Sequence, residues 1–198
     1  MKVHSIQDFN QTKIDGLILL STHQYSDNRG FFLESWNENE WRKILKDNGQ
    51  NFSKFVQDNH SWSTKGVLRG MHYQTNPYSQ GKLIRCIKGE IFDVAIDIRL
   101  NSPSFGKWVG IYLSGENNMQ LWIPTGFAHG FLTLSDEADV IYKVTEFWNK
   151  DCERSLNWKD TSIDIQWPIE NIVNSIQLST KDKNAPFLSD LEKGDLYE

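Results

Sequence analysis

A chain of 198 residues is long enough to bury one sizeable core and fits a single domain. Its net charge of −5 and the lack of any run of basic residues exclude a protein built to bind a nucleic-acid polymer. Residues 1–16 are too polar for a signal peptide, no segment approaches membrane-spanning length, and Cys86 and Cys152 follow no disulfide or metal spacing. We therefore expect a cytoplasmic protein with free thiols that does not contact a membrane.

Strand-favouring aromatic residues are abundant, with 8 Trp, 6 Tyr and 11 Phe, and clusters of turn-forming residues recur through the middle of the chain. This composition predicts an all-β sandwich or barrel. At the N-terminal end, a short strand at 16–20, a polar turn at 26–30 and an apolar stretch at 31–33 predict a hairpin or an extended arm. Residues 37–47 predict one short helix, because apolar side chains recur at helical spacing behind Asn37 as its N-cap.

Residues 54–148 read as strands and turns throughout. Between 92 and 99, apolar and polar side chains alternate, which predicts a strand with one buried face. The tail beyond Pro168 predicts extended chain with a short helix near its end. We therefore expect one domain over 1–198, made of an N-terminal arm and helix in 1–53, a barrel core in 54–168 and a C-terminal extension in 169–198.

Two polar residues interrupt the apolar segment GVLRGMHYQ, namely Arg69 and His72. Strict alternation sends them to opposite faces of a strand, so a shared pocket requires a bulge, and Gly70 is the residue at which one can form. Lys82 opens the next strand. Because an unpaired buried charge is costly, we expect an anionic group opposite Lys82.

Three further segments carry candidate residues. The segment IPTGFAHGF has the P-x-G-x-x-H spacing of the second cupin motif, in which a tight turn delivers a histidine, here His129, into a barrel. Tyr142 shares a strand face with apolar neighbours, so its hydroxyl group should point inward. Asp160 lies in a turn between two tryptophans. Taken singly, His72 is as consistent with a satisfied core histidine as with a functional one, and Tyr142 is more typical of a buried tyrosine whose hydroxyl group bonds to the backbone.

In order and spacing along almost the whole chain, the sequence resembles the dTDP-4-dehydrorhamnose 3,5-epimerase family. The resemblance rests on the segments DNRGFFLE, FVQDNHS, GVLRGMHYQ, KGEIFDVAIDIR, SPSFGKW, QLWIPTGFAHGFL, YK and W-x-D. It implies an all-β fold, a cupin-type jelly-roll barrel of two antiparallel sheets with a few short helices at the periphery. It also implies a homodimer that uses no cofactor or metal and acts on a dTDP-4-keto-6-deoxy sugar.

The resemblance also implies roles for individual residues. His72 matches the general base, Asp160 the carboxylate that orients it, Tyr142 the acid on the opposite face, and Lys82 the cation that stabilises an enolate at the 4-keto oxygen. Trp148 stands where the family usually has a tyrosine that stacks on thymine. The residues that match substrate-binding positions are Arg29, Phe32, Glu34, Gln57, Asn59, Arg69, His129, Trp148, Glu153 and Lys181.

The implied reaction inverts carbons 3 and 5 of dTDP-4-dehydro-6-deoxy-D-glucose to give dTDP-4-dehydro-L-rhamnose, in dTDP-rhamnose biosynthesis. Epimerisation beside a ketone needs a base, a positive charge near the developing enolate oxygen and a proton source across the ring. His72, Lys82 and Tyr142 are residues of these three types. Because the ketone acidifies both flanking carbons, one base and one acid can serve both inversions.

Three alternatives stay open. Relatives on the same scaffold invert only carbon 3 or carbon 5, or move the keto group. A metal-dependent cupin oxygenase needs an HxH pair followed by Glu, whereas here Gln74 replaces the second histidine and no Glu follows before Glu90. A non-catalytic sugar-binding cupin has no need for a base and an acid on opposite sides of a pocket.

Overall fold

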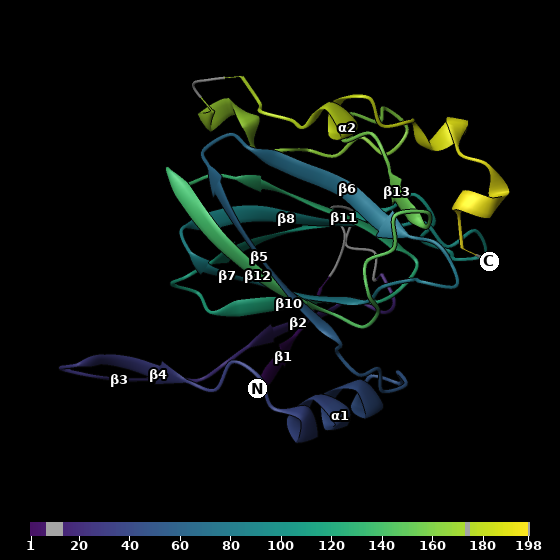
Figure 1. The fold of residues 1–198 in the computed structure, drawn as a ribbon. Helices are drawn as coiled ribbons and strands as arrows, with labels where there is room; N and C mark the ends of the chain where they lie inside the picture. Colours follow the sequence, from purple (N-terminus) through teal and green to yellow (C-terminus); the bar gives the residue numbers. More distant parts are fainter. Residues whose placement is uncertain (7–13, 173–174, 198) are drawn as a thin grey trace.

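The computed structural model describes residues 1–6, 14–172 and 175–197 and has two antiparallel sheets that face each other (Figure 1). One sheet has the strand order β1-β2-β10-β7-β12-β5, the other β13-β6-β11-β8-β9, and β3 and β4 form a separate hairpin. This arrangement confirms the predicted all-β, jelly-roll class. None of the helices in these ranges is long and apolar enough to span a membrane.

The bounds of the strands are β1 Lys2–His4, β2 Ile18–Ser21, β3 Gln24–Asp27, β4 Gly30–Leu33, β5 Gln57–Thr64, β6 Leu68–Gln74, β7 Lys82–Lys88, β8 Glu90–Asp97, β9 Trp108–Ser114, β10 Met119–Ile123, β11 Phe127–Thr133, β12 Glu137–Val144 and β13 Glu153–Ser155. The helices are α1 Glu38–Asp47 and α2 Thr180–Lys183, with 3-10 turns at Ile169–Asn171, Leu188–Asp190 and Lys193–Asp195. The division into arm, core and extension stays a prediction. Residues before 54 also contribute β1 and β2 to the six-stranded sheet, where β2 pairs with β10.

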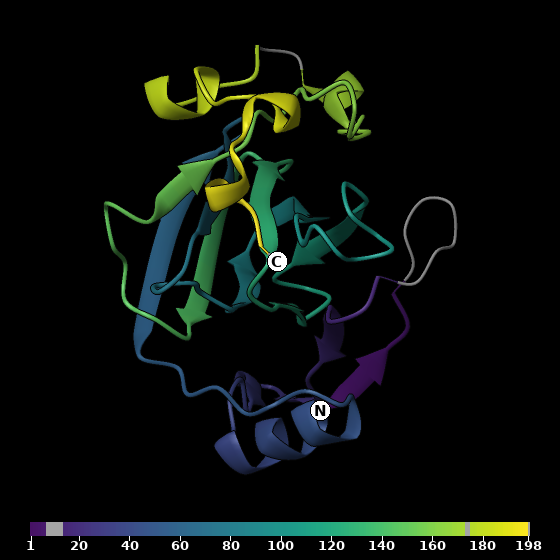
Figure 2. The ribbon, with the colours of Figure 1, turned by 90° about the vertical axis from the view of Figure 1, so that its right-hand side faces the viewer.

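The predicted N-terminal elements are confirmed. The hairpin forms from β3 and β4, with Asp27 opposite Gly30 at its turn. Helix α1 begins after Asn37, whose side chain accepts hydrogen bonds from the backbone N–H groups of residues 39 and 40 and so satisfies two donors of the first turn. Trp41 and Leu45 are fully buried on the face of α1 that packs against β2 and β10, below the barrel in Figure 2.

Strand β8 is buried on both faces, so the prediction of a single buried face was wrong. Ile91 and Ala95 face the barrel interior. Phe92, Val94 and Ile96 pack on the other side against Trp158 and Trp167, because the C-terminal part of the chain covers the five-stranded sheet (Figures 1 and 2). Alternation along one strand indicates that one face is more polar than the other. It cannot show that a segment distant in the sequence covers the more polar face.

The expected bulge at Gly70 is confirmed. His129 pairs with His72 and Phe131 pairs with Arg69, so β6 has one residue more than β11 between these pairs. Gly70 has φ +128°, and a Cβ atom there would lie 2.5 Å from the Cα of Gly130. Only glycine permits so close an approach of β6 and β11, and this approach sets which side chains of β6 face the barrel interior.

Candidate active site

A pocket opens between the two sheets near the ends of β6 and β7. Seven of the fourteen residues predicted from the sequence line it, so the fold brings together side chains from β5, β6, β7, β12 and β13. His72 belongs to the five-stranded sheet and Tyr142 to the six-stranded sheet, so they approach the pocket from opposite walls. The full set is Gln57, Asn59, His72, Tyr73, Gln74, Gln80, Lys82, Tyr142, Trp148 and Glu153.

His72 is paired with a carboxylate on the C-terminal extension. Its Nε2 atom lies 2.5 Å from Oδ1 of Asp182, which is 3 % exposed. Burial lowers the pKa of His72 below its ordinary value, while the hydrogen bond and negative charge of Asp182 act in the opposite direction. His72 is therefore a neutral base at neutral pH, with a carboxylate in place to stabilise its protonated form.

The expected contact between His72 and Asp160 was wrong. Oδ1 of Asp160 accepts hydrogen bonds from Ser162 and from the backbone N–H of Ile163, and Oδ2 accepts one from the N–H of Leu188 at 2.6 Å. Both carboxylate oxygens of Asp160 thus accept hydrogen bonds, and these bonds connect its turn to the C-terminal tail. It is Asp182 that occupies the place beside the imidazole.

A sequence signal for Asp182 exists in the segment Ser179-Thr180-Lys181-Asp182, which has the spacing of a helix N-cap followed by an acidic N3 residue. In the structure the Ser179 hydroxyl oxygen accepts a hydrogen bond from the N–H of Asp182, which starts α2. Lys181, the preceding residue on α2, forms an ion pair of 2.8 Å with Glu153 at the pocket. The predicted residues Lys181 and Glu153 therefore meet.

Lys82 is buried beside His72, and its Nζ donates to the His72 carbonyl oxygen at 3.0 Å. Burial lowers the pKa of Lys82 to about 8, against the opposing charges of Asp93 and Glu153. The expected anionic surroundings of Lys82 are thus supplied by these two carboxylates. An ammonium group with so little hydration interacts strongly with any negative charge that develops near it.

Tyr142 faces the pocket from β12, where burial raises its pKa and the positive charge of Arg69 partly offsets this effect. Arg69 is exposed and donates to the Ser63 hydroxyl oxygen at 3.0 Å. The phenol is therefore protonated at neutral pH and can act as a proton donor.

His129 lies on β11, where it pairs with His72 of β6, and its buried side chain is bonded to a second buried residue. Its Nε2 lies 2.8 Å from Oδ1 of Asp93, whose place in the alternating pattern of β8 indicates a polar strand position but not this contact. The two adjacent histidines are thus each supported by a carboxylate, Asp182 for His72 and Asp93 for His129.

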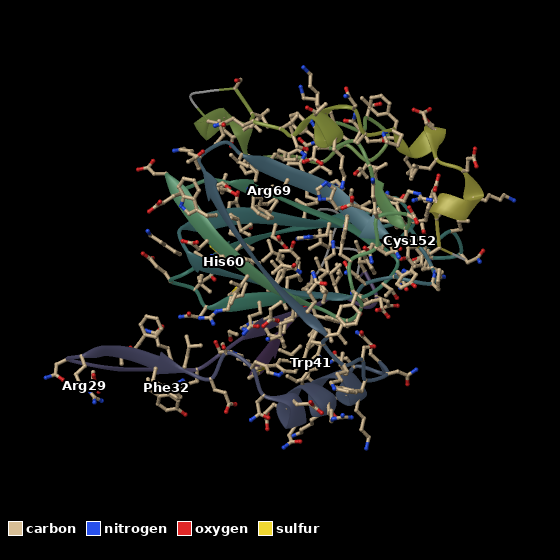
Figure 3. The ribbon with its side chains drawn as sticks, in the orientation of Figure 1. Arg29, Phe32, Trp41, His60, Arg69 and Cys152 are labelled. Carbon is tan, nitrogen blue, oxygen red and sulfur yellow. The ribbon has the colours of Figure 1, made fainter. Side chains whose placement is uncertain are left out.

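Three predicted substrate-binding residues lie elsewhere. Arg29 and Phe32 are on the β3–β4 hairpin and Glu34 directly follows it, whereas the pocket is lined from β5 onward. Figure 3 shows Arg29 and Phe32 on the projecting hairpin, away from the barrel. Both residues are strongly exposed. The side chain of Arg29 is 85 % exposed, and Phe32 as a whole residue is 70 % exposed.

Metal-ligating side chains are not grouped in the part of the chain that the structure describes, where no three His, Cys, Asp or Glu residues converge on one point. The amide of Gln74, at the position of the second histidine of a metal-dependent cupin, instead bonds to backbone groups of residues 78, 147 and 149. The pocket therefore presents a neutral imidazole, a protonated phenol and an ammonium group. These three groups can catalyse proton transfer at a carbon beside a carbonyl group.

These features define a cupin-type barrel enzyme with an acid–base pocket, and comparison with known proteins gives its family. The family model for dTDP-4-dehydrorhamnose 3,5-epimerase matches residues 11–190. The chain is 53 % identical over 175 residues to the dTDP-4-dehydrorhamnose 3,5-epimerase of Shigella flexneri, covering 88 % of this chain and 92 % of that protein. The chain belongs to the dTDP-4-dehydrorhamnose 3,5-epimerase family, whose members are isomerases.

Solved structures agree with this assignment. The chain superposes with a TM-score of 0.89 and 44 % identity on a dTDP-6-deoxy-D-glucose-3,5-epimerase from Legionella pneumophila in complex with dTDP-4-keto-L-rhamnose, over 100 % of this chain and 98 % of that one. It also superposes, with a TM-score of 0.84 and 31 % identity, on a 3'-monoepimerase from Streptomyces bikiniensis in complex with dTDP-quinovose, over 100 % and 92 % of the two chains.

The pairing of His72 with Asp182 predicts a change in the titration of the imidazole. In Asp182→Asn the opposing negative charge is lost, so the pKa of His72 should fall further below its ordinary value. The measurement is the pH titration of the His72 C2 proton by NMR, assigned by its absence in His72→Ala.

Asp160→Asn is the matched control, because it removes a carboxylate of similar burial that the structure places away from His72. It should leave the His72 titration unchanged but lower the stability by about 1–3 kcal/mol, since backbone donors lose a charged acceptor. A fall in the His72 pKa in Asp160→Asn, and none in Asp182→Asn, would restore the prediction made from sequence.

Proposed function

We propose that the protein epimerises dTDP-4-dehydro-6-deoxy-D-glucose at carbons 3 and 5 to dTDP-4-dehydro-L-rhamnose, a step of dTDP-rhamnose biosynthesis. The observation that carries this proposal is that His72 and Tyr142 line one pocket from opposite sheets, with Lys82 beside them. A sugar ring held between these walls has a base on one face and an acid on the other. The names of the relatives support the choice of substrate.

Each inversion begins at the imidazole. Asp182 holds Nε2 of His72, which leaves Nδ1 as the nitrogen that takes a proton from the carbon beside the ketone. The electron pair moves to the ketone oxygen, where the Lys82 ammonium stabilises the enolate. The phenol of Tyr142 then donates a proton to the opposite face of the same carbon, which inverts its configuration. The pocket needs only this set of groups for both carbons.

A single-position epimerase is the second candidate, because a 3'-monoepimerase shares the fold at 31 % identity. The double epimerase is favoured because the relatives named as 3,5-epimerases are more similar, at 53 % and 44 % identity. A non-catalytic sugar-binding protein would have no use for the supported base or the buried ammonium group. A metal-dependent oxygenase would need a ligand at Gln74, whose amide is occupied by backbone groups.

Deuterium exchange tests the reaction and its roles. In heavy water, the wild-type enzyme should introduce deuterium at both carbon 3 and carbon 5 of the 4-keto-6-deoxy sugar nucleotide, read by NMR with a downstream 4-ketoreductase present. His72→Ala should abolish exchange at both carbons. Tyr142→Phe should keep exchange but lower product formation by about 10²–10⁴-fold, because only reprotonation loses its acid.

The possible results separate the candidates. Exchange at one carbon alone would identify a single-position epimerase, and no exchange by the wild-type protein would leave only binding. Unchanged turnover in either variant would refute the role given to that residue.

The pH dependence follows from Lys82. Activity requires its ammonium form, which is present below the lowered pKa of about 8 and is lost as the pH rises through that value. The plot of kcat/KM against pH, which reports groups of the free enzyme, should therefore fall on the alkaline side near pH 8. Lys82→Arg, which stays charged, should remove this alkaline limb at a lower maximal rate. An alkaline limb that stays near pH 8 in Lys82→Arg would assign it to another group.

We further propose that the protein is a homodimer in which the β3–β4 hairpin of each subunit completes the pocket of the other. Tyr25, Phe31 and Phe32 are exposed on this hairpin, which projects from the body of the molecule (Figure 1). Exposed aromatic side chains grouped in this way favour a protein contact. Arg29 and Phe32, which the resemblance assigns to substrate binding, can then serve the pocket of a second copy.

Subunit mixing tests this arrangement. Arg29→Ala/Phe32→Ala and His72→Ala should each be impaired alone. After joint refolding, a mixed dimer has one intact pocket, built from the His72 of one subunit and the hairpin of the other, so about a quarter of the wild-type activity should return for random twofold pairing. No recovery in a mixture shown to contain mixed dimers would mean that the hairpin serves its own subunit.

A cytoplasmic location is part of the same proposal. Cys86 and Cys152 are both free thiols in the structure, which fits a reducing compartment.

A further inference from the structure

The loop after β12, which carries Trp148 to the rim of the pocket, is held by the amide groups of three glutamines. Gln57 on β5 accepts a hydrogen bond from the N–H of Trp148 at 3.3 Å. Gln80, before β7, donates to the Glu146 carbonyl oxygen at 2.7 Å. Gln74, at the end of β6, bonds to the residues on both sides of Trp148. Side chains from three separate parts of the chain thus bond to the peptide groups of residues 146–149 in one loop.

Gln74 makes the most of these contacts. Its Nε2 donates to the carbonyl oxygens of Tyr78 and Phe147 at 2.5 and 3.1 Å, and its Oε1 accepts from the N–H of Asn149 at 2.7 Å. Both donors of the amide are therefore used, and its oxygen is engaged. The contacts to residues 147 and 149 are those that the backbone of a neighbouring strand would make.

The position of Gln74 is itself fixed. Its side chain is buried, and its carbonyl oxygen accepts a hydrogen bond from the hydroxyl group of Tyr197 near the C-terminus. Glu153 on β13 pairs with it across the sheet. Gln74 is therefore a rigid support, whereas the indole of Trp148 that it positions is 56 % exposed at the pocket.

We infer that Gln74 and Gln80 are positioning residues that set the orientation of Trp148 and thereby the affinity for the nucleotide half of the substrate. This inference rests on the proposed function, in which Trp148 stacks on the base of a thymidine diphosphate sugar. An indole is a good stacking platform only when its plane is held in place before the ligand arrives. The glutamine contacts fix the backbone from which the indole projects, while the indole itself hydrogen-bonds to Glu153.

A residue of this kind has a distinct kinetic effect. The nucleotide is remote from the carbons that exchange protons, so its contacts have similar strength in the ground state and the transition state. Losing them raises KM and leaves kcat nearly unchanged. A general loss of structure, in contrast, lowers the amount of active enzyme and hence the apparent kcat.

The test uses Gln74→Ala and the isosteric Gln74→Glu, which keeps the acceptor for Asn149 but places a carboxylate against two carbonyl oxygens. Thymidine diphosphate binding is measured by calorimetry, and KM and kcat are measured with the nucleotide sugar. Both variants should raise Kd and KM by about tenfold, as expected for losing one or two net hydrogen bonds. The value of kcat should stay within about threefold. Gln80→Ala, which loses a single contact, should give a smaller change in the same direction.

Gln50→Ala is the matched control, because the amide of Gln50 also donates to a carbonyl oxygen and accepts from an indole N–H, but under α1. It should change stability without changing Kd. Trp148→Ala provides the second control. If Gln74 acts through the indole, Gln74→Ala should have little further effect on Kd in the Trp148→Ala background.

The outcomes separate this inference from the proposed function. An unchanged Kd and KM in Gln74→Ala and Gln80→Ala, with a normal wild-type enzyme, would overturn the inference alone. So would an equal effect of Gln74→Ala with and without Trp148. A wild-type protein that neither binds thymidine diphosphate nor exchanges deuterium would overturn the proposed function and this inference with it.

Discussion

The contact between His72 and Asp182 joins two parts of the chain that are 110 residues apart, and the rest of the site depends on it. An imidazole in a closed pocket becomes a poorer base as burial lowers its pKa, unless a carboxylate stabilises the charged form. That carboxylate comes from the C-terminal extension, whose apolar side chains, Ile176, Leu178 and Leu188 among them, pack against the cluster on the outer face of the five-stranded sheet. The extension therefore contributes a carboxylate to the candidate site, and its packing on the barrel holds Asp182 in place.

Burial acts in one consistent way on the three groups proposed to carry out the reaction, namely the base, the acid and the ammonium group. It lowers the pKa of His72 and of Lys82 and raises that of Tyr142, so each group is shifted toward its neutral form. A neutral imidazole and a protonated phenol are the states needed for a base and an acid. Lys82 must stay charged, and it does so because Asp93 and Glu153 oppose the effect of burial. His72 is also opposed by a carboxylate, Asp182, but its ordinary pKa is already below neutrality, so it stays neutral while Lys82, with a pKa of about 8, stays charged.

Local sequence signals predicted those features that depend on neighbouring residues. Asn37 starts α1, glycine at residue 70 allows the bulge in β6, and the alternation along β8 identified a strand. What the sequence could not predict depends on distant packing. Asp160 and Asp182 both lie in polar segments beyond the barrel, and only the folded extension decides which carboxylate reaches the imidazole. The burial of both faces of β8 was missed for the same reason.

The face of β6 that carries His72 also carries a residue with a different proposed role. Two residues along the strand, Gln74 stands where a metal-dependent relative would carry a second ligand, and its amide instead fixes the backbone on either side of Trp148. A histidine there could not offer two donors and an acceptor in the plane of one amide group. A glutamine in place of a histidine at residue 74 therefore removes a potential metal ligand and provides hydrogen bonds that hold the loop. On this one strand, the proposed base His72 and the proposed support Gln74 thus have separate tasks, proton transfer and the positioning of the loop that carries Trp148.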